Sequence, residues 1–335
     1  MKIIFFETNK DEQKELQILF GNIQVEYYEE KLDSDNVNLA ENADIVSVFV
    51  NSEVSKEIID KLPNLKLIQT RSTGYDHVDV EYAKSKSIKV ATVPSYGART
   101  VAEFTFALIL SLSRKPINAY QQLRVGEGYD ISSFQGFDLY DKTLGVIGTG
   151  KIGKNVTKIA KGFGMNVIAC DLYPDQKFAD EIGFKYVPLS ELLANSDIIT
   201  LHTFYTKENY HLINKDNIGE IKKGGYIINT ARGELIETDA LIKALASKQL
   251  AGCALDVLES ERHLKDEWEV LKDSHRRIDD FRLLLEDRML IDLRQVIVTP
   301  HIAFYTKEAE LEILKTTADT IVSFIENKQI NILEK

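Results

Sequence analysis

Short apolar runs alternate with segments of helical period along most of the chain. In the first 95 residues the apolar runs have the length of buried strands, and the segments between them have the spacing of helices. Strands separated by helices pair in parallel, because each helix carries the chain back across the sheet. The pattern predicts strands at residues 2–7, 23–27, 43–50, 65–71 and 89–93, with helices near 12–20, 55–61 and 80–85.

A second alternation begins at Leu144 and predicts a second parallel sheet. Its expected strands are residues 144–147, 167–170, 186–187, 198–201, 226–229, 252–255 and 296–298. Before it, Thr100 and Glu103 fit a capping box, and residues 104–112 are apolar almost all round. We therefore expect a long buried helix to begin at Thr100 and to carry the chain towards the second sheet.

The last helical segment, residues 306–328, has an apolar stripe formed by Leu314, Ala318, Ile321 and Ile325. This stripe has to be buried, and the first domain is the available surface. A chain of 335 residues is also too long for one ordinary core. The predicted fold is α/β: two Rossmann/flavodoxin-like domains, each a parallel sheet flanked by helices. The expected domains are residues 1–103 with 304–335, and residues 104–303.

A glycine loop between two strands is the strongest local motif. Gly148, Gly150 and Gly153 follow the strand at 144–147 and precede a helix, and Asp171 ends the next strand. Such a unit binds a dinucleotide: the glycines allow a tight turn, close approach of the pyrophosphate and close helix packing. Asp171 would accept hydrogen bonds from an unmodified ribose and repel a 2′-phosphate, so we expect NAD and not NADP.

Composition limits the kinds of partner. The formal net charge is -11, and no cluster of Lys and Arg with interleaved aromatics occurs, which argues against a nucleic-acid surface. Cys170 and Cys253 lie in apolar runs and are expected to be buried, reduced thiols. No metal site is suggested. Met1 and Lys2 lead straight into the first strand and no apolar run has membrane-spanning length, so we expect a cytoplasmic protein without a membrane anchor.

Residues 262–295 are dense in charge, with apolar residues at helical spacing. The favoured interpretation is a solvated helical excursion that packs one face on its neighbour. The alternative is a role in subunit contact.

Several side chains that could perform chemistry follow predicted strands of the second sheet, where ligands of such sheets bind. They are Arg232, Asp256, Glu261 and His301. In a hydride transfer to a 2-oxo acid, Arg232 could bind the carboxylate, and His301 could give a proton to the carbonyl oxygen. Glu261 could hold the imidazole, although Glu259 is an alternative partner for it.

Six motifs together resemble the D-isomer-specific 2-hydroxyacid dehydrogenases, most closely the D-lactate dehydrogenase branch. They are Arg71 to Asp79, Tyr96 to Glu103, the glycine loop, Asn229 to Glu234, Ala254 to Val257, and Thr299 to Thr306. The resemblance implies two α/β domains with an interrupted substrate domain and an active site in the cleft between them. It also implies NAD as cofactor, Arg232, Glu261 and His301 as catalytic residues, and a homodimer formed through the nucleotide domains.

The same resemblance implies further contacts. Substrate would meet the backbone at Thr73 and Gly74 and the side chains of Tyr96 and Phe304, and Asp256 would bind the nicotinamide carboxamide. The remaining cofactor residues would be Thr100, Lys151, Ile152, Thr203, Phe204, Asn209, Thr230 and Ala231.

Two features depart from the family. Phe204 stands where a proline is usual, and the stretch from Glu261 to His301 is longer than usual in the lactate branch. The expected activity is reduction of pyruvate or a near relative to the D-2-hydroxy acid. The alternatives are a bulkier branched or aromatic 2-oxo acid, or an NAD-sensing corepressor that binds protein partners.

Overall fold

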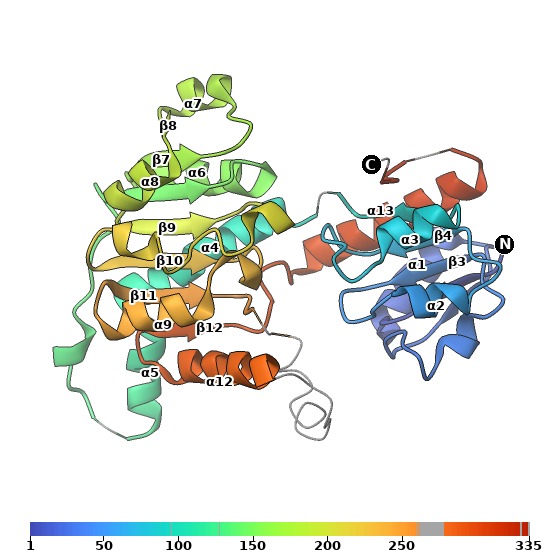
Figure 1. Ribbon diagram of the computed structural model, residues 1–335, viewed down its shortest axis with the longest axis horizontal. Coiled ribbons are helices and arrows are strands. Elements are labelled where there is room, and N and C mark those ends of the chain that lie inside the picture. The colour runs from blue at the N-terminus through green and yellow to red at the C-terminus, as the bar shows by residue number, and fades with distance from the viewer. Residues whose placement is uncertain (95, 127, 260, 262–277, 329, 334–335) are drawn as a thin grey trace. The chain divides into compact units, whose positions relative to one another are not determined.

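The computed structural model describes residues 1–94, 96–126, 128–259, 261, 278–328 and 330–333. The chain divides into two compact units (Figure 1), which we call unit 1 (Met1–Gly97 with Tyr305–Lys335) and unit 2 (Ala98–Phe304). The division predicted at residues 103/104 lies inside a helix of unit 2, and the chain leaves unit 1 earlier, after Gly97. Which domain binds substrate and which binds cofactor remains a prediction at this point.

Unit 1 is a three-layer α/β structure around a parallel sheet of strand order β2-β1-β3-β4-β5. Its strands are β1 (Ile3–Phe5), β2 (Val25–Tyr27), β3 (Ile45–Val48), β4 (Leu67–Thr70) and β5 (Lys89–Ala91). Its helices are α1 (Lys10–Phe20), the 3₁₀ turn η1 (Val37–Ala40), α2 (Lys56–Asp60), α3 (Val80–Ser85) and α13 (Lys307–Ile325). Helices α1 and α13 cover one face of the sheet, and η1, α2 and α3 cover the other.

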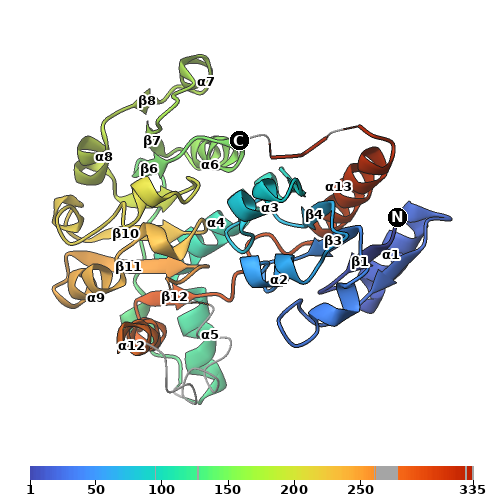
Figure 2. The ribbon, with the colours of Figure 1, turned by 45° about the vertical axis from the view of Figure 1, so that its right-hand side comes forward.

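The C-terminal segment completes unit 1, as the apolar stripe predicts. Leu314, Ala318 and Ile321 of α13 are buried in the same core as Phe5 and Leu16. Beyond α13 the backbone pairs antiparallel with the edge of the sheet, through bonds of 3.1 Å from Thr92 N to Asn331 O and 2.9 Å from Leu333 N to Val90 O. In Figure 2, α13 and α1 lie on the same side of β1 and β3.

Unit 2 has a parallel sheet of order β12-β11-β10-β9-β6-β7-β8. Its strands are β6 (Thr143–Ile147), β7 (Asn166–Cys170), β8 (Lys185–Tyr186), β9 (Ile198–Leu201), β10 (Gly225–Asn229), β11 (Leu250–Leu255) and β12 (Val296–Val298). Its α-helices are α4 (Ala98–Arg114), α5 (Pro116–Arg124), α6 (Lys151–Gly162), α7 (Gln176–Ile182), α8 (Leu189–Asn195), α9 (Thr238–Ala246) and α12 (Ile278–Asp292). The 3₁₀ turns are η2 (Ser132–Phe134), η3 (Lys207–Asn209), η4 (Ile218–Glu220) and η5 (Gly233–Leu235).

Both faces of this sheet are covered, which explains why its strands read as apolar runs. Helices α4 and α6 pack on one face, where Phe106 and Val156 are buried, and α8 and α9 pack on the other, where Leu192 and Leu241 are buried. The predicted class, two parallel sheets flanked by helices, is confirmed. Each strand is within a few residues of its predicted position, because a strand buried on two faces must be apolar throughout.

The capping box predicted at Thr100 is wrong. Helix α4 already begins at Ala98, so Thr100 lies in its first turn. Gly97, with a φ of 60°, directly precedes the helix. Side chains of the α4 interior are buried as expected, including Phe106 and Ile109.

Helix α5 was not predicted, and it has no buried residue. Pro116 occupies its first turn after Lys115, which has a left-handed backbone. The helix and the loop that follows it extend away from the sheet of unit 2 (Figure 1).

The charged segment is helical where it is described. Helix α12 lies beside α9 and β12 (Figures 1 and 2) and buries Leu284 and Leu290, while Leu285 is exposed. The prediction of a helix that packs one face is thus confirmed for residues 278–292, and residues 262–277 lie outside the described part of the chain.

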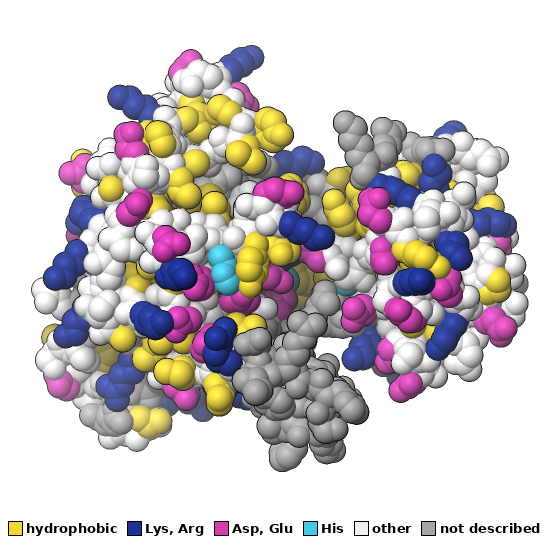
Figure 3. Space-filling view, viewed as in Figure 1, with side chains coloured by type: hydrophobic (Ala, Val, Ile, Leu, Met, Phe, Trp, Pro, Cys, Tyr) yellow, Lys and Arg dark blue, Asp and Glu magenta, His cyan; other side chains and the backbone are white. Residues whose placement is uncertain are grey.

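The surface carries charges of both signs (Figure 3), and only one of the two cysteines is fully buried. On the face shown in Figure 3, acidic and basic side chains are intermixed on both units. Cys253 is buried and Cys170 only half-buried, and neither forms a disulfide. Burial raises the pKa of both thiols, which disfavours the reactive thiolate. Within the described residues, no helix is long and apolar enough to cross a membrane.

Candidate active site

The glycine loop follows β6, at the point where the strand order changes direction. Strands β7 and β8 lie on one side of β6, and β9 to β12 lie on the other. Gly148 has a φ of 89°, and a Cβ there would lie 2.7 Å from the His202 carbonyl carbon, so the loops after β6 and β9 touch through their backbones. A Cβ at Gly153 would lie 2.0 Å from the Gly148 carbonyl oxygen, which explains the close packing of α6 on the loop.

Gly150 differs from its two neighbours in the loop. A Cβ there would meet nothing within 4 Å, and no side chain caps the N-terminus of α6. The space above Gly150 and the N–H groups of the first turn therefore fit a pyrophosphate. Lys151 is exposed and Ile152 is half-buried at the start of this helix.

Asp171 contacts the glycine loop directly. Its Oδ2 accepts hydrogen bonds from Thr149 N at 2.5 Å and Thr149 Oγ1 at 2.8 Å, and its Oδ1 accepts one from Tyr173 N at 2.8 Å. Tyr186 of β8 contacts the same hydroxyl, with 2.8 Å between its OH and Thr149 Oγ1. Thr149 and Tyr186 thus hold the predicted ribose carboxylate. The sequence analysis missed both, because only folding brings β8 beside the loop.

The loop after β9 keeps a defined shape without the proline that Phe204 replaces. Asn209 Nδ2 donates to Phe204 O at 2.6 Å, and Asn209 Oδ1 accepts from Thr206 N at 2.7 Å. Thr203 Oγ1 lies 3.4 Å from Phe204 O, and the Phe204 side chain is 72% exposed. Asn209 therefore stabilises the loop through its own hydrogen bonds. Its predicted role in cofactor binding did not include this contribution.

An Asn side chain shapes the turn that carries Arg232. The buried Asn229 accepts from Ala231 N at 3.0 Å and donates to Arg232 O at 2.8 Å. Arg232 Nη1 donates to Ala231 O at 2.8 Å, and Thr230 Oγ1 lies 3.2 Å from Thr105 Oγ1 of α4. These bonds fix the backbone of the turn, and with it the point from which the half-buried Arg232 side chain extends.

Glu261 and His301, 40 residues apart, meet in the structure: Glu261 Oε1 lies 2.9 Å from His301 Nδ1. Asp256, 1% exposed, fixes the loop that carries the imidazole, since its carboxylate accepts from Thr299 Oγ1 at 2.6 Å, Ile302 N at 2.9 Å and Ala303 N at 2.8 Å. Burial raises the pKa of Asp256, and these bonds oppose the shift. Both Asp256 oxygens are engaged here, which its predicted contact with the nicotinamide carboxamide did not anticipate.

Glu259, the alternative partner of His301, binds a different histidine. Its Oε1 lies 2.6 Å from His211 Nε2. His211 and His301 both have left-handed backbones, with φ of 52° and 55°. The structure thus pairs each glutamate of this turn with its own histidine.

The predicted substrate residues of unit 1 lie in two neighbouring loops. Thr73 Oγ1 donates to Val93 O at 2.7 Å and ties the loop after β4 to the segment after β5, which carries Tyr96. Ser72 Oγ donates to Gly74 O at 2.6 Å. In unit 2, the Phe304 ring lies edge-on to His301 with 6.4 Å between ring centroids. Thr100 is half-buried in α4.

Comparison with known proteins identifies the family. The model described as "D-isomer specific 2-hydroxyacid dehydrogenase, NAD binding domain" matches residues 106–303. A relative from Escherichia coli (strain K12) named "D-lactate dehydrogenase" is 36% identical over 329 residues, which cover 96% of each chain. The chain belongs to the D-isomer-specific 2-hydroxyacid dehydrogenases. The predicted family is therefore confirmed.

Two further similarities involve proteins that differ in the substrates they are named for. A crystal structure of "D-Lactate dehydrogenase from aquifex aeolicus complexed with NAD and Lactic acid" has a TM-score of 0.86 and 35% identity, with 97% of this chain and 96% of that chain covered. An "Aromatic 2-oxoacid reductase" from Clostridium sporogenes (strain ATCC 15579) is 36% identical over 294 residues, 86% of this chain and 84% of the relative. This 2-hydroxyacid dehydrogenase is an NAD-dependent oxidoreductase, as predicted, and NAD is its cofactor.

Proposed function

We propose that this dehydrogenase is a D-lactate dehydrogenase, which reduces pyruvate with NADH. The observation that carries the proposal is the 2.9 Å contact between Glu261 and His301, on the same sheet edge as the Arg232 turn and the glycine loop. A guanidinium, an imidazole and a carboxylate are the groups that reduction of a 2-oxo acid requires.

Each residue of the trio has one task. Arg232 binds the substrate carboxylate through its planar fork and draws electron density from the neighbouring carbonyl. With Nδ1 bonded to Glu261, His301 holds its transferable proton at Nε2 and gives it to the carbonyl oxygen. Glu261 fixes the orientation of the ring through Nδ1. The bound cofactor supplies the hydride that completes the reduction.

The cofactor is held by unit 2 through the glycine loop and the carboxylate at the end of β7. Gly148, Gly150 and Gly153 leave room for the pyrophosphate, and Asp171 selects NAD over NADP by accepting from the ribose. The loops after β9 and β10 complete the proposed cofactor site, to which Thr203, Phe204, Asn209, Thr230 and Ala231 contribute, together with Thr100, Lys151, Ile152 and Asp256.

Substrate binding is proposed for the backbone at Thr73 and Gly74 and for the side chains of Tyr96 and Phe304. The aromatic 2-oxoacid reductase at 36% identity supports a second candidate, a bulkier 2-oxo acid. The two candidates differ in the size of the substrate side chain, so the ratio of their kcat/KM values decides between them. A corepressor role is the weaker alternative, because such a protein does not need the Glu261–His301 pair.

The test follows NADH absorbance with purified protein and pyruvate, 2-oxoisocaproate or phenylpyruvate in parallel, with the chirality of the product determined. Fast reduction of pyruvate to the D-acid would support D-lactate dehydrogenase, and preference for another acid would favour the second candidate. His301→Gln should lower kcat by about 10²-fold or more, the scale of a lost general acid, with NADH binding retained. If wild-type protein binds NADH but reduces no 2-oxo acid, the proposed activity is refuted.

We also propose that two copies associate through α5 and the loop after it. Ile117, Tyr120 and Leu123 on this helix are 41%, 60% and 49% exposed, and Tyr129 in the loop is 90% exposed. Apolar surface on one projecting element is typical of a protein interface. Sedimentation velocity should show a dimer, and Tyr120→Lys should shift it towards monomer. A monomeric wild-type protein would refute this interface.

A further inference from the structure

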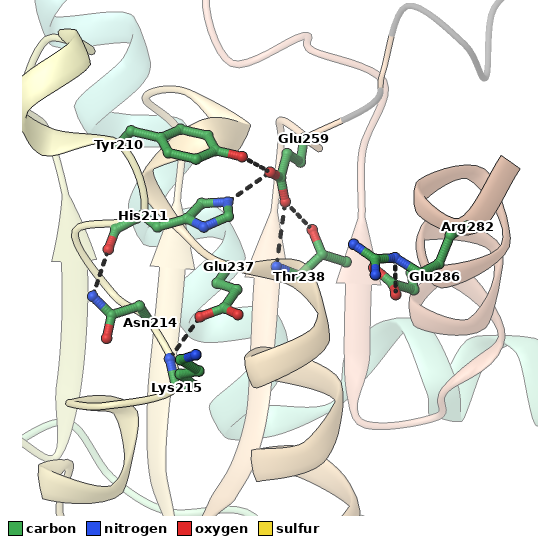
Figure 4. Close-up of polar contacts among 9 residues, drawn as sticks. All are labelled: Tyr210, His211, Asn214, Lys215, Glu237, Thr238, Glu259, Arg282 and Glu286. Atoms are coloured by element: carbon green, nitrogen blue, oxygen red, sulfur yellow. Dashed lines mark hydrogen bonds and ion pairs between the residues drawn. The ribbon is translucent and has the colours of Figure 1, made fainter. Parts of the chain in front are cut away.

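Glu259 is a buried carboxylate to which the proposed reaction assigns no task. Its side chain is 6% exposed, and an ionised group in that position requires several hydrogen-bond donors to offset its desolvation. Four donors reach it (Figure 4). Oε1 lies 2.6 Å from His211 Nε2 and 3.0 Å from Tyr210 OH, and Oε2 accepts from Thr238 Oγ1 at 2.8 Å and Thr238 N at 3.3 Å.

The donors come from two segments far apart in the sequence. Tyr210 and His211 end the loop after β9, and their rings stack with centroids 3.8 Å apart. Thr238 begins α9, just beyond the η5 turn that follows Arg232. Burial and the charge of Glu259 raise the pKa of Tyr210 to about 12, so this phenol remains a donor at neutral pH.

All three segments joined at Glu259 carry proposed site residues. The loop after β9 carries Thr203, Phe204 and Asn209. Arg232 is the N-cap of η5, which leads to Thr238 at the start of α9. The third segment is a turn after β11 that is closed by a 3.3 Å bond from Glu261 N to Leu258 O. Glu259 and Glu261 therefore belong to one turn.

Backbone packing makes this junction rigid. A Cβ at Gly233 would lie 2.1 Å from the Leu258 carbonyl carbon and 2.4 Å from Glu259 N, so the Arg232 turn rests directly on the Glu259 turn. His211 N also donates to Glu234 O at 2.8 Å, and Ile213 N to Leu235 O at 3.0 Å. The loop after β9 and the η5 segment are therefore joined by backbone bonds of their own, and a change at Glu259 acts first on its own turn, which carries Glu261.

We propose that Glu259 is a positioning residue for the reaction: it anchors the turn that presents Glu261 to His301. Through its donors the same carboxylate holds the loop after β9 and the start of α9 in register with that turn. The inference rests on the proposed function, because it assigns Glu259 a task in the same site. It adds a second glutamate that acts on the chemistry only through Glu261.

Glu259→Gln tests this role without a large change in volume. An amide has one acceptor oxygen and an NH₂ group that can only donate, so the new side chain keeps its Thr238 bonds only if its NH₂ group faces His211 and Tyr210, which must then accept and no longer donate. The negative charge and two donor bonds to it are lost, which weakens the anchoring of the turn. A shift of about 1 Å at Glu261 is enough to cost up to about 10²-fold in rate.

Glu237→Gln is the matched control, because Glu237, the N-cap of α9, forms a neighbouring tie to Lys215, four residues beyond His211 (Figure 4). Its Oε2 accepts from Lys215 N at 2.7 Å, and a glutamine oxygen can replace that acceptor. It has no contact with the Glu261 turn among the bonds described. Thr238→Val is a milder second variant, which removes one donor from Glu259 and keeps the side-chain shape.

The experiment measures kcat for pyruvate, the dissociation constant of NADH and the thermal midpoint for these variants, each alone and combined with Glu261→Gln. We expect Glu259→Gln to lower kcat by about 10-fold or more in the wild-type background and by less than about 2-fold when Glu261 is already Gln. Thr238→Val should show the same dependence on Glu261 with a smaller loss. Glu237→Gln should retain wild-type kcat.

Equal losses of kcat with and without Glu261 would overturn the proposal, as would a loss in Glu237→Gln as large as that in Glu259→Gln. If Glu259→Gln does not fold, Thr238→Val decides by the same comparison. Absence of turnover in the wild-type protein would refute the proposed function itself. Normal turnover in the wild-type protein, with independent effects of the two glutamates on kcat, would refute only the role of Glu259.

Discussion

Gly150→Ala separates cofactor binding from stability, because the structure gives the three loop glycines different surroundings. At Gly148 and Gly153 a Cβ would lie 2.7 Å and 2.0 Å from backbone atoms, whereas at Gly150 it would meet nothing within 4 Å. The Gly150 backbone, with φ of -65° and ψ of -161°, is also open to alanine. We expect the free energy of unfolding of Gly150→Ala to stay within about 1 kcal/mol of wild type.

Binding of NADH should change much more. The added methyl group extends about 1.5 Å from Cα, into the space where the pyrophosphate would lie. A displacement of that size breaks a hydrogen bond to the first turn of α6, and one such bond to a charged group contributes about 1.5–3 kcal/mol. The dissociation constant of NADH should therefore rise by about 10- to 100-fold.

The assay combines fluorescence titration with NADH and a thermal melt without it. Gly162→Ala, on the same helix and also with open space around its Cβ, is the control that should leave NADH binding unchanged. If Gly150→Ala binds NADH as tightly as wild type, the pyrophosphate does not lie over Gly150, and our account of the loop is refuted.

Three further predictions concern neighbouring groups. Gly233→Ala should lower stability by about 1–3 kcal/mol and reduce kcat, because its Cβ would clash with the Leu258 backbone; a normal melt with normal turnover would contradict this. Asp171→Ala should raise kcat/KM with NADPH relative to NADH, and an unchanged ratio would mean that the ribose is recognised elsewhere. Burial lowers the pKa of His202 to about 3, whereas the unfolded chain protonates this residue near about pH 6.5. Stability should therefore fall as the pH drops from about 6.5 towards 3, by about 2 kcal/mol between pH 7 and pH 5. His202→Asn should remove that loss from urea melts, and an equal pH dependence in both proteins would argue against it.

The strands, and the positions of most proposed site residues at the strand ends, could be predicted because the sequence expresses them locally. A strand buried on two faces is a short apolar run, and Arg232, Asp256 and His301 follow such runs at the sheet edge. Helix α5 was missed because it buries no side chain and thus has no apolar stripe facing a core. The start of α4 was misplaced because the Thr100 to Glu103 spacing matches a capping box while the helix already begins at Ala98.

Partnerships between distant residues could not be predicted from local pattern. Sequence spacing left Glu259 open as an alternative to Glu261 as the partner of His301, since both follow the same strand. The choice depends on the path of the loop that brings His211 to Glu259 from 48 residues away. Likewise, Tyr186 reaches Thr149 only because β8 pairs with β7 at the sheet edge.

The interruption of unit 1 by unit 2 has a consequence for biosynthesis. Residues 98–304 form a continuous unit and can fold as soon as they leave the ribosome, whereas residues 1–97 must wait for a segment translated more than two hundred positions later. Until α13 arrives, the face of β1 that carries Ile3 and Phe5 lacks part of its cover, and the outer edge of β5 lacks the pairing near Asn331. An open edge beside bare apolar surface is a template for association with other nascent chains. The N-terminal third of this protein is therefore the part that completes its fold last, although it is made first.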